Sequence, residues 1–380
     1  MTHLRTTIIL LALAVLLALS SNPSSAHAQT LTVLHTFTGG TDGLSPSGGL
    51  IRDKYGNLYG TTYNGGDGGC LSYGCGIIFK VKPSGEEKIL YKFNSKTGEL
   101  PASRLFRDAA GNLYGGTTRH FGTIFRLSES PKTLTTLHTF AAHGDGADPR
   151  GQLIQDAQGN LYGTSFGFEH GCGTVFKIDG TGNMTILRAF SVKEGCSPWG
   201  GLVLDAAGNL YGTTERGGDT SCNCGVVFKL SNTGQETVLY RFMGGSDGSS
   251  PLGPLVSDAE GNFYGITGND GEGDGCCGTV FKIDPNGAET ILYRFQGGAD
   301  GGFPSNGGLI RDKQGNLYGA TTRGGTATPA SGVIFKVDPS GNEIVLWSFG
   351  SEGTPNGDLV LDGAGNLYGT TASTVFKLTP

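Results

Sequence analysis

The 380-residue chain is short of basic residues and has only one long hydrophobic run, and both shortages limit what it can bind. Its formal net charge is −6, from 27 lysines and arginines against 33 aspartates and glutamates. A net negative chain is not drawn to a phosphate backbone, so we expect no nucleic-acid partner. Beyond residue 19 no segment approaches the roughly twenty apolar residues that a spanning helix needs, so we expect no membrane span.

The single hydrophobic run lies at the N-terminus and has the organisation of a secretory signal. Arg5 precedes the apolar stretch from Ile8 to Leu19, and a polar stretch then ends in Ala26-His27-Ala28. This pattern predicts a signal peptide over residues 1–28, cleaved near Ala28, and one mature domain over residues 29–380. We therefore expect a secreted protein, extracellular or periplasmic.

Helical periodicity and familiar catalytic motifs are absent as well. The sequence contains no nucleophile elbow, HExxH motif, phosphate loop or paired-carboxylate signature, which removes the support for the corresponding enzyme classes. Glycine, in contrast, makes up 68 residues, about 18 % against a usual value of about 7 %. Because 37 % of the residues are hydrophobic and the pattern is periodic, this glycine indicates many turns around a packed core.

A repeat of about fifty residues organises the whole chain. The string GNLYG or GNFYG occurs seven times. Each copy also has an aspartate three residues before its first glycine, a proline seven or eight residues before that aspartate, an I/V-F-K/R triplet and an L-x-x-F segment. The tyrosines of the seven strings are Tyr59, Tyr114, Tyr162, Tyr211, Tyr264, Tyr318 and Tyr368.

Each repeat contains four short apolar runs separated by turn residues, which predicts four antiparallel strands. In the first copy these are Gly49–Asp53, Asn57–Thr62, Gly76–Val81 and Lys88–Phe93. Seven such units predict an all-β, seven-bladed β-propeller. The N-terminal strand Leu31–Phe37 supplies the fourth strand that the last repeat lacks, and so closes the ring.

The residues shared by all repeats are best explained by folding. An aspartate just before Gly-Asn suits a turn in which its side chain accepts backbone N–H groups, and the repeated tyrosines and phenylalanines suit packing between blades. Function is more often carried by long links on a rigid scaffold. We therefore favour the face that carries the second-to-third-strand links and the links between blades.

The eight cysteines belong to that face, and an exported protein favours disulfides over a metal or redox site. The candidates fall into four neighbouring pairs. Cys70 with Cys75 is the most natural bridge, while the close spacing of the last two pairs leaves cross-pairing between blades four and five open. The pairs are Cys70 and Cys75, Cys172 and Cys196, Cys222 and Cys224, and Cys276 and Cys277.

One loop has acidic residues at alternate positions, Asp270, Glu272 and Asp274, like the start of a calcium loop. The glutamate that an EF-hand requires is replaced by Phe281, so a solvated acidic loop is the alternative. Calcium is the only cofactor for which the sequence gives an indication.

Two further groups of polar residues are candidates for binding or chemistry. Arg119, Arg216 and Arg323 follow the motif tyrosine by five residues in three blades and suit carboxylates of a glycan or peptide. The second group consists of His120, Glu169, His170 and Glu215. Two members of this group could act as a general acid and a general base. For both groups the alternative explanation is that the residues are isolated on the surface.

The motifs GNLYGTT, GG-x-DG-x-x-P-x-GGL (Gly39–Leu50) and G-x-I/V-F-K resemble the GloVer tandem repeat of bacterial exported choice-of-anchor proteins. The resemblance extends from Leu31 to Lys377. It implies a secreted or surface protein of repeat architecture, and it supplies no catalytic residues.

We therefore expect a secreted, monomeric, non-catalytic binding or scaffold protein that uses the long-link face for an extracellular glycan, peptide or protein. The alternative is a secreted polysaccharide-active hydrolase or lyase with its site at the channel mouth.

Overall fold

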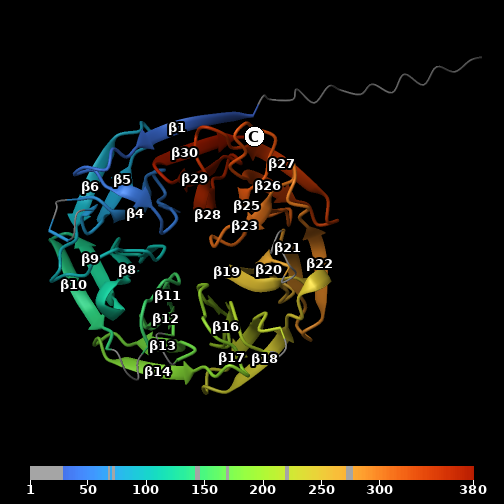
Figure 1. Cartoon of the computed structure of the whole chain (residues 1–380). Coiled ribbons are helices and arrows are strands. Elements are labelled where there is room, and N and C mark those ends of the chain that lie inside the picture. The colour runs from blue at the N-terminus through green and yellow to red at the C-terminus, as the bar shows by residue number, and fades with distance from the viewer. Residues whose placement is uncertain are drawn as a thin grey trace, which may run out of the picture.

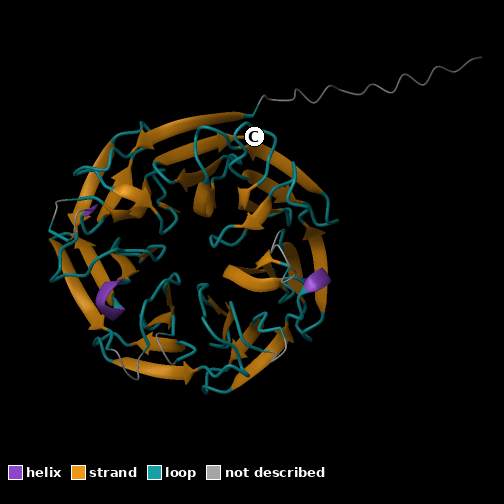
Figure 2. Ribbon diagram, viewed as in Figure 1, coloured by secondary structure: helices purple, strands orange, loops and turns teal. Residues whose placement is uncertain are grey.

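Seven β-sheets form a closed ring around a central axis (Figure 1). The computed structural model describes residues 29–66, 69–70, 73–141, 146–167, 171–218, 222–270 and 277–380. Nearly all named elements are strands, and the helical ones are the 3₁₀ turns η2 (Arg119–Phe121) and η3 (Gly245–Asp247) (Figure 2). The predicted seven-bladed β-propeller is confirmed.

Each blade is an antiparallel sheet whose strands follow one another from the axis outward. Blade 1 comprises β2 (Leu44–Pro46), β3 (Ile51–Arg52), β4 (Leu58–Asn64), β5 (Ile77–Val81) and β6 (Glu87–Lys92). Blade 2 comprises β7 (Phe106–Arg107), β8 (Leu113–Thr117), β9 (Thr123–Glu129) and β10 (Lys132–Thr139). Blade 3 comprises β11 (Ile154–Gln155), β12 (Leu161–Ser165), β13 (Thr174–Ile178) and β14 (Met184–Ala189), and blade 4 comprises β15 (Val203–Leu204), β16 (Leu210–Thr214), β17 (Val226–Leu230) and β18 (Glu236–Arg241).

The other three blades have the same order. Blade 5 comprises β19 (Ser249–Ser257), β20 (Phe263–Asn269), β21 (Thr279–Ile283) and β22 (Glu289–Arg294). Blade 6 comprises β23 (Gly302–Pro304), β24 (Ile310–Arg311), β25 (Leu317–Arg323), β26 (Val333–Val337) and β27 (Glu343–Ser348). Blade 7 comprises β28 (Pro355–Leu361), β29 (Leu367–Thr371), β30 (Thr374–Thr379) and β1 (Thr30–Thr36).

The N-terminal strand closes the ring, as predicted. β1 is the outer strand of blade 7 and pairs antiparallel with β30, from Thr30 opposite Thr379 to Thr36 opposite Thr374 (Figure 1). This pairing covers the edge of β30, which would otherwise present unpaired backbone groups to other chains.

The repeated aspartate caps the turn between the first two strands of its blade. In blade 1, Asp53 Oδ1 accepts hydrogen bonds from the backbone N–H groups of Tyr55 and Asn57, each at 2.9 Å. Its Oδ2 accepts from Asn57 Nδ2 at 2.8 Å and from the hydroxyl of the motif tyrosine, Tyr59, at 3.1 Å. The tyrosine-to-aspartate bond recurs in all seven blades at 2.8–3.1 Å. The aspartate and the tyrosine therefore have a structural role.

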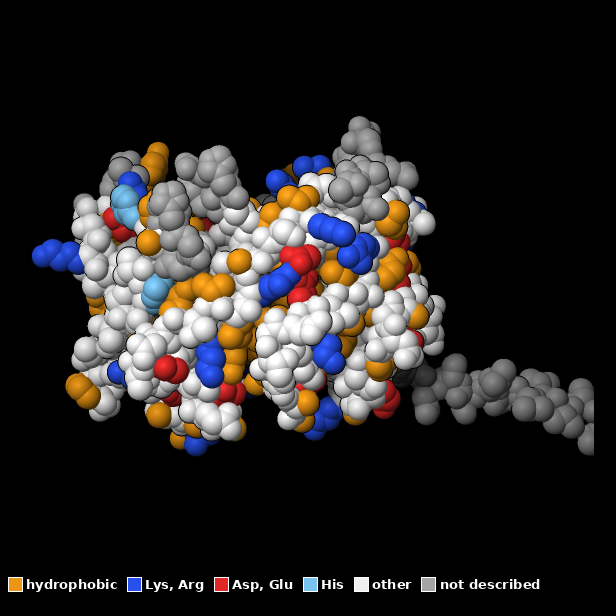
Figure 3. Space-filling model, turned by 90° about the horizontal axis from the view of Figure 1, so that it is seen from below, with side chains coloured by type: hydrophobic (Ala, Val, Ile, Leu, Met, Phe, Trp, Pro, Cys, Tyr) orange, Lys and Arg blue, Asp and Glu red, His pale blue; other side chains and the backbone are white. Residues whose placement is uncertain are grey.

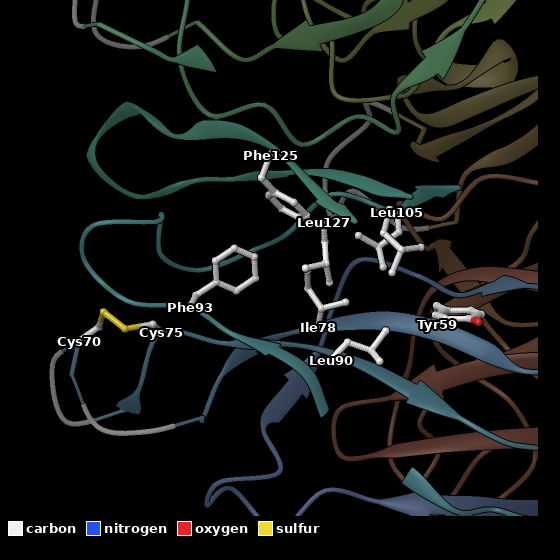
Figure 4. Packing of buried hydrophobic residues seen from close by; sticks show 10 residues of the cluster. Tyr59, Cys70, Cys75, Ile78, Leu90, Phe93, Leu105, Phe125 and Leu127 are labelled. Atoms are coloured by element: carbon white, nitrogen blue, oxygen red, sulfur yellow. A yellow bond between two sulfur atoms is a disulfide. The ribbon is translucent and has the colours of Figure 1, made fainter. Parts of the chain in front are cut away.

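A ring of phenylalanine pairs joins the blades. The phenylalanine that follows each outer strand meets the fully buried phenylalanine of the third strand in the next blade, with ring centroids 4.9–5.5 Å apart in an edge-to-face arrangement. Figure 4 shows one such pair, Phe93 and Phe125, in the core between blades 1 and 2. The seven pairs are Phe37–Phe79, Phe93–Phe125, Phe140–Phe176, Phe190–Phe228, Phe242–Phe281, Phe295–Phe335 and Phe349–Phe376.

The disulfides join neighbouring cysteines of the long-link face. The bridges are Cys70–Cys75 (Figure 4), Cys172–Cys196 and Cys222–Cys224. Cross-pairing of Cys222 or Cys224 with blade 5 is thereby ruled out. Cys277 is also disulfide-bonded, and Cys276 lies outside the described residues.

The outer surface carries a mixture of charges. On the side of the disc seen in Figure 3, basic and acidic side chains are interspersed among polar ones. Within the described part of the chain, no helix is both long enough and apolar enough to cross a bilayer.

The second glycine of GNLYG is required because the third-strand phenylalanine lies directly against it. In blade 3, a Cβ placed on Gly163 would come within 2.6 Å of Phe176 Cζ and 2.7 Å of Leu153 Cδ2. Gly163→Ala is therefore expected to lower the free energy of unfolding by about 1–3 kcal/mol, the usual cost of overpacking a core.

Gly180 is a matched control, since a Cβ there would meet nothing within 4 Å. Urea unfolding followed by tryptophan fluorescence compares the two variants. Equal stabilities of Gly163→Ala and Gly180→Ala would contradict the proposed role of the close contact.

Candidate functional site

A cavity of about 570 Å³ lies at one end of the central channel, and all seven blades contribute to its wall. One group of lining residues comes from the segment of each blade that precedes or begins its inner strand. The other group comes from the ends of second strands or directly after them, among them Tyr63, Glu215, Asn269 and Thr322. The long links leave the second strands at this end, so the cavity is on the face favoured from the sequence.

The repeat fixes both ends of the segment that lines the cavity. The leading proline packs against the glycine that opens the third strand of the preceding blade; a Cβ on Gly76, for example, would lie 2.6 Å from Pro101 Cδ. Four or five residues later comes a leucine that is buried in the core in every blade, such as Leu50 and Leu105. Of the residues between the proline and the leucine, the middle one is glycine in most blades, and the others differ from blade to blade.

The inner strand leaves regular pairing in this segment. In blade 1 the sequence expectation placed a single strand at Gly49–Asp53, but the structure has two short strands, β2 and β3, separated by residues 47–50. The continuous inner strands β19 and β28 instead shift register there, between Leu252 and Val256 and between Asn356 and Val360. Such irregularities release side chains from the ladder and turn them toward the channel.

The most deeply buried charged group of the cavity is Asp358, from blade 7. It is 7 % exposed, and its Oδ2 lies 3.5 Å from Arg104 Nε, which also donates to the carbonyl of Leu50 at 3.1 Å. Its Oδ1 has no hydrogen-bond partner among the described residues. Gly49 makes room for it, since a Cβ there would lie 2.5 Å from Asp358 Oδ2.

Burial raises the pKa of Asp358 to about 6, although the nearby Arg104 guanidinium acts in the opposite direction. The carboxylate is therefore ionised at pH 7.5 and accepts hydrogen bonds only. A buried acceptor that lacks a partner is costly to the protein.

An aromatic side chain, Trp199 of blade 4, stands at another part of the wall. The guanidinium carbon of Arg150 lies 4.6 Å from its ring centroid, and Phe166 makes an edge contact at 5.5 Å. Arg150 is itself oriented by a 2.8 Å hydrogen bond from its Nε to Asp148 Oδ2. Trp199 is thus held in place and remains partly exposed to the cavity.

The arginines and acid/base candidates named from the sequence are dispersed. Arg119 pairs with the buried Glu99 at 3.0 Å, and His120 lies 4.0 Å from the same carboxylate with its side chain 74 % exposed. Arg216 lies 3.5 Å from Glu215. Of the candidates that lie within the described residues, Glu215 is the one that lines the cavity.

The remaining candidates lie beside the cavity or outside the described residues. Arg323 stacks at 4.0 Å on the ring of Phe303, which lines the cavity. Asp270 is buried, 3.9 Å from Arg294. Calcium stays a prediction, because most of its loop cannot be described. Glu169, His170, Glu272 and Asp274 all lie outside the described residues.

Reasoning from the sequence overlooked Arg104, Arg150, Trp199 and Asp358. A signal was nevertheless present, because these residues occupy the positions between the repeated proline and leucine that change from blade to blade. In a repeat protein, such variable positions between fixed ones mark the side chains that the fold does not require.

A family model, that of the Gloeobacter/Verrucomicrobia repeat, matches residues 23–168 and 164–377. The chain belongs to this repeat family. No curated protein matches its sequence.

Solved structures resemble this one in fold. A streptogramin B lyase is 14 % identical with a TM-score of 0.65, over 92 % of this chain and 97 % of that one. The extracellular domain of a protein described as a hybrid two-component system from B. thetaiotaomicron is 13 % identical with a TM-score of 0.55, over 91 % of this chain and 41 % of that one. At these identities the likeness shows a shared fold alone.

Asp358 should make stability depend on pH. Its unfolded pKa is about 4 and its folded pKa about 6, so ionisation favours the unfolded state and stability falls as the pH rises from about 4 to 6. Asp358→Asn is expected to raise the free energy of unfolding by about 1–3 kcal/mol at pH 7.5, and by much less at pH 4.

Urea unfolding at both pH values measures this difference. Glu260→Gln, at an exposed turn on the opposite end of blade 5, removes the same charge and should leave stability nearly unchanged. A less stable Asp358→Asn variant at pH 7.5 would show that the carboxylate contributes to the fold rather than weakening it.

Proposed function

We propose that this protein is a secreted, non-catalytic binding protein that holds a glycan or peptide in the channel-mouth cavity. The proposal rests on the positions at which the blades differ from one another in sequence. The residues that build the fold recur in every blade, whereas the cavity wall combines Arg104, Arg150, Trp199 and Asp358. Residues that break a repeat without serving its packing are best explained by a ligand.

The size and composition of the cavity support this proposal. A volume of about 570 Å³ falls within the roughly 300–1,000 Å³ typical of small-ligand sites. Partly buried aromatic rings next to a few oriented polar groups are the usual lining of such sites. The cavity can therefore take a small ligand or the end of a polymer.

Export is supported by two independent features. Residues 1–28 have the organisation of a secretory signal. Three disulfides join cysteines of the described residues, and such bonds persist in oxidising compartments outside the cytosol.

Binding can be tested on arrays of oligosaccharides and peptides, with a matched pair of aromatic variants. Trp199→Ala removes the ring from the cavity wall, whereas Tyr55→Ala removes an aromatic ring, 73 % exposed, from an aspartate-capped turn at the other end of blade 1. We expect Trp199→Ala to lose binding at least tenfold and Tyr55→Ala to keep it.

Equal binding by the two variants would place the ligand elsewhere. Conversion of a bound oligosaccharide to product, abolished by Glu215→Gln or Asp358→Asn, would support the alternative of a polysaccharide-active hydrolase or lyase.

Export predicts a defined N-terminus. Expressed in a bacterial host with its own first 28 residues, the protein should be recovered outside the cytoplasm beginning at Gln29. Mass spectrometry of the intact protein gives its N-terminus, and a cytoplasmic protein that retains the leader would contradict the prediction.

A further inference from the structure

The charged side chains of the cavity wall are already paired with opposite charges. Among the described residues, the four that line it are Arg104, Arg150, Glu215 and Asp358. Arg104 lies 3.5 Å from Asp358, Arg150 2.8 Å from Asp148, and Glu215 3.5 Å from Arg216. A ligand with a net charge would leave one charge unbalanced in a partly desolvated site, which is costly. The pairing therefore favours a neutral ligand.

The same groups retain hydrogen-bonding capacity. Asp358 is more than nine-tenths buried, and its Oδ1, which has no partner within the described residues, needs a donor. The guanidinium of Arg104 has five N–H groups, of which its Nε–H is used toward the Leu50 carbonyl. A carboxylate next to a guanidinium offers an acceptor beside several donors, which matches hydroxyl groups because each can both donate and accept.

Asp358 and Trp199 lie on opposite sides of the channel. Asp358 belongs to blade 7 and Arg104 to blade 2, which flank blade 1, whereas Trp199 belongs to blade 4 on the far side of the ring (Figure 1). A ligand that fills the cavity therefore meets polar groups on one side and an aromatic ring on the other. A sugar ring has both properties, with hydroxyls at its edge and C–H groups on its face.

We infer that the cavity binds a neutral saccharide, whose hydroxyl groups are held by Asp358 and Arg104 and whose ring packs against Trp199. The inference rests on the proposed binding function and narrows its ligand. Uronate-containing glycans and peptides with free termini are disfavoured, because each of their charged groups would need an unpaired counterpart, and the charged side chains that line the wall among the described residues are already paired.

Isothermal titration calorimetry at pH 7.5 tests the inference with three sets of probes. These are neutral oligosaccharides (gluco-, xylo-, manno- and galacto-configured), oligogalacturonates and short unmodified peptides. We expect at least one neutral oligosaccharide to bind and the two charged sets not to bind.

Two variants locate the interaction. Asp358→Asn keeps the size of the side chain but removes the carboxylate, and it should weaken binding at least tenfold; Glu260→Gln should leave it unchanged. Affinity of the unmodified protein should also fall between pH 7.5 and pH 5, since burial raises the pKa of Asp358 to about 6, and this pH dependence should be absent in Asp358→Asn.

The outcomes separate the inference from the function on which it rests. If only oligogalacturonates or peptides bind, and Trp199→Ala abolishes that binding, the cavity is a binding site but the inference of a neutral sugar is wrong. A neutral oligosaccharide whose affinity is the same for Asp358→Asn also overturns the inference. If no probe binds, both proposals fail.

Discussion

The structure depends on the edge-to-face contact between the outer-strand phenylalanine of one blade and the third-strand phenylalanine of the next. Each pair requires a glycine in the second strand, because a methyl group there would occupy the space of the ring, as at Gly163 beneath Phe176. Seven such contacts in succession fix the angle between blades, and that angle determines how many blades close the ring. The channel and its cavity exist because this contact is made seven times.

The fold could be predicted from the sequence because each of its devices is local and repeated. The aspartate-capped turn, the motif glycine and the packing phenylalanine recur at constant spacing, so one copy explains the others. Even the closure by β1 could be inferred, since the first and last repeats are incomplete in complementary ways. The split inner strand of blade 1 was missed, because the bulged segment after Pro46 has no periodicity that would reveal it.

The candidate site was harder to predict, for a physical reason. Asp358 and Arg104 are more than 250 residues apart in sequence and meet only because blades 7 and 2 flank blade 1. The search for chemistry led instead to residues with reactive side chains in the links after second strands, such as His120, which lies 4.0 Å from Glu99. The informative residues were those that interrupt the repeat, since natural sequences depart from a consistent pattern mainly at functional or strained sites.

The pairing of Thr30 with Thr379 has a consequence for how the molecule can be cut and rejoined. Thr30 and Thr379 lie side by side on adjacent strands, so a short peptide linker could connect a chain that begins at Gln29 to its own C-terminus without disturbing the ring. A new opening could then be made in any of the exposed hairpins between third and fourth strands, such as the one around Ser84. The six circular permutants would share one cavity while differing in which blade is completed last, and this would separate the order of assembly from the identity of the binding residues.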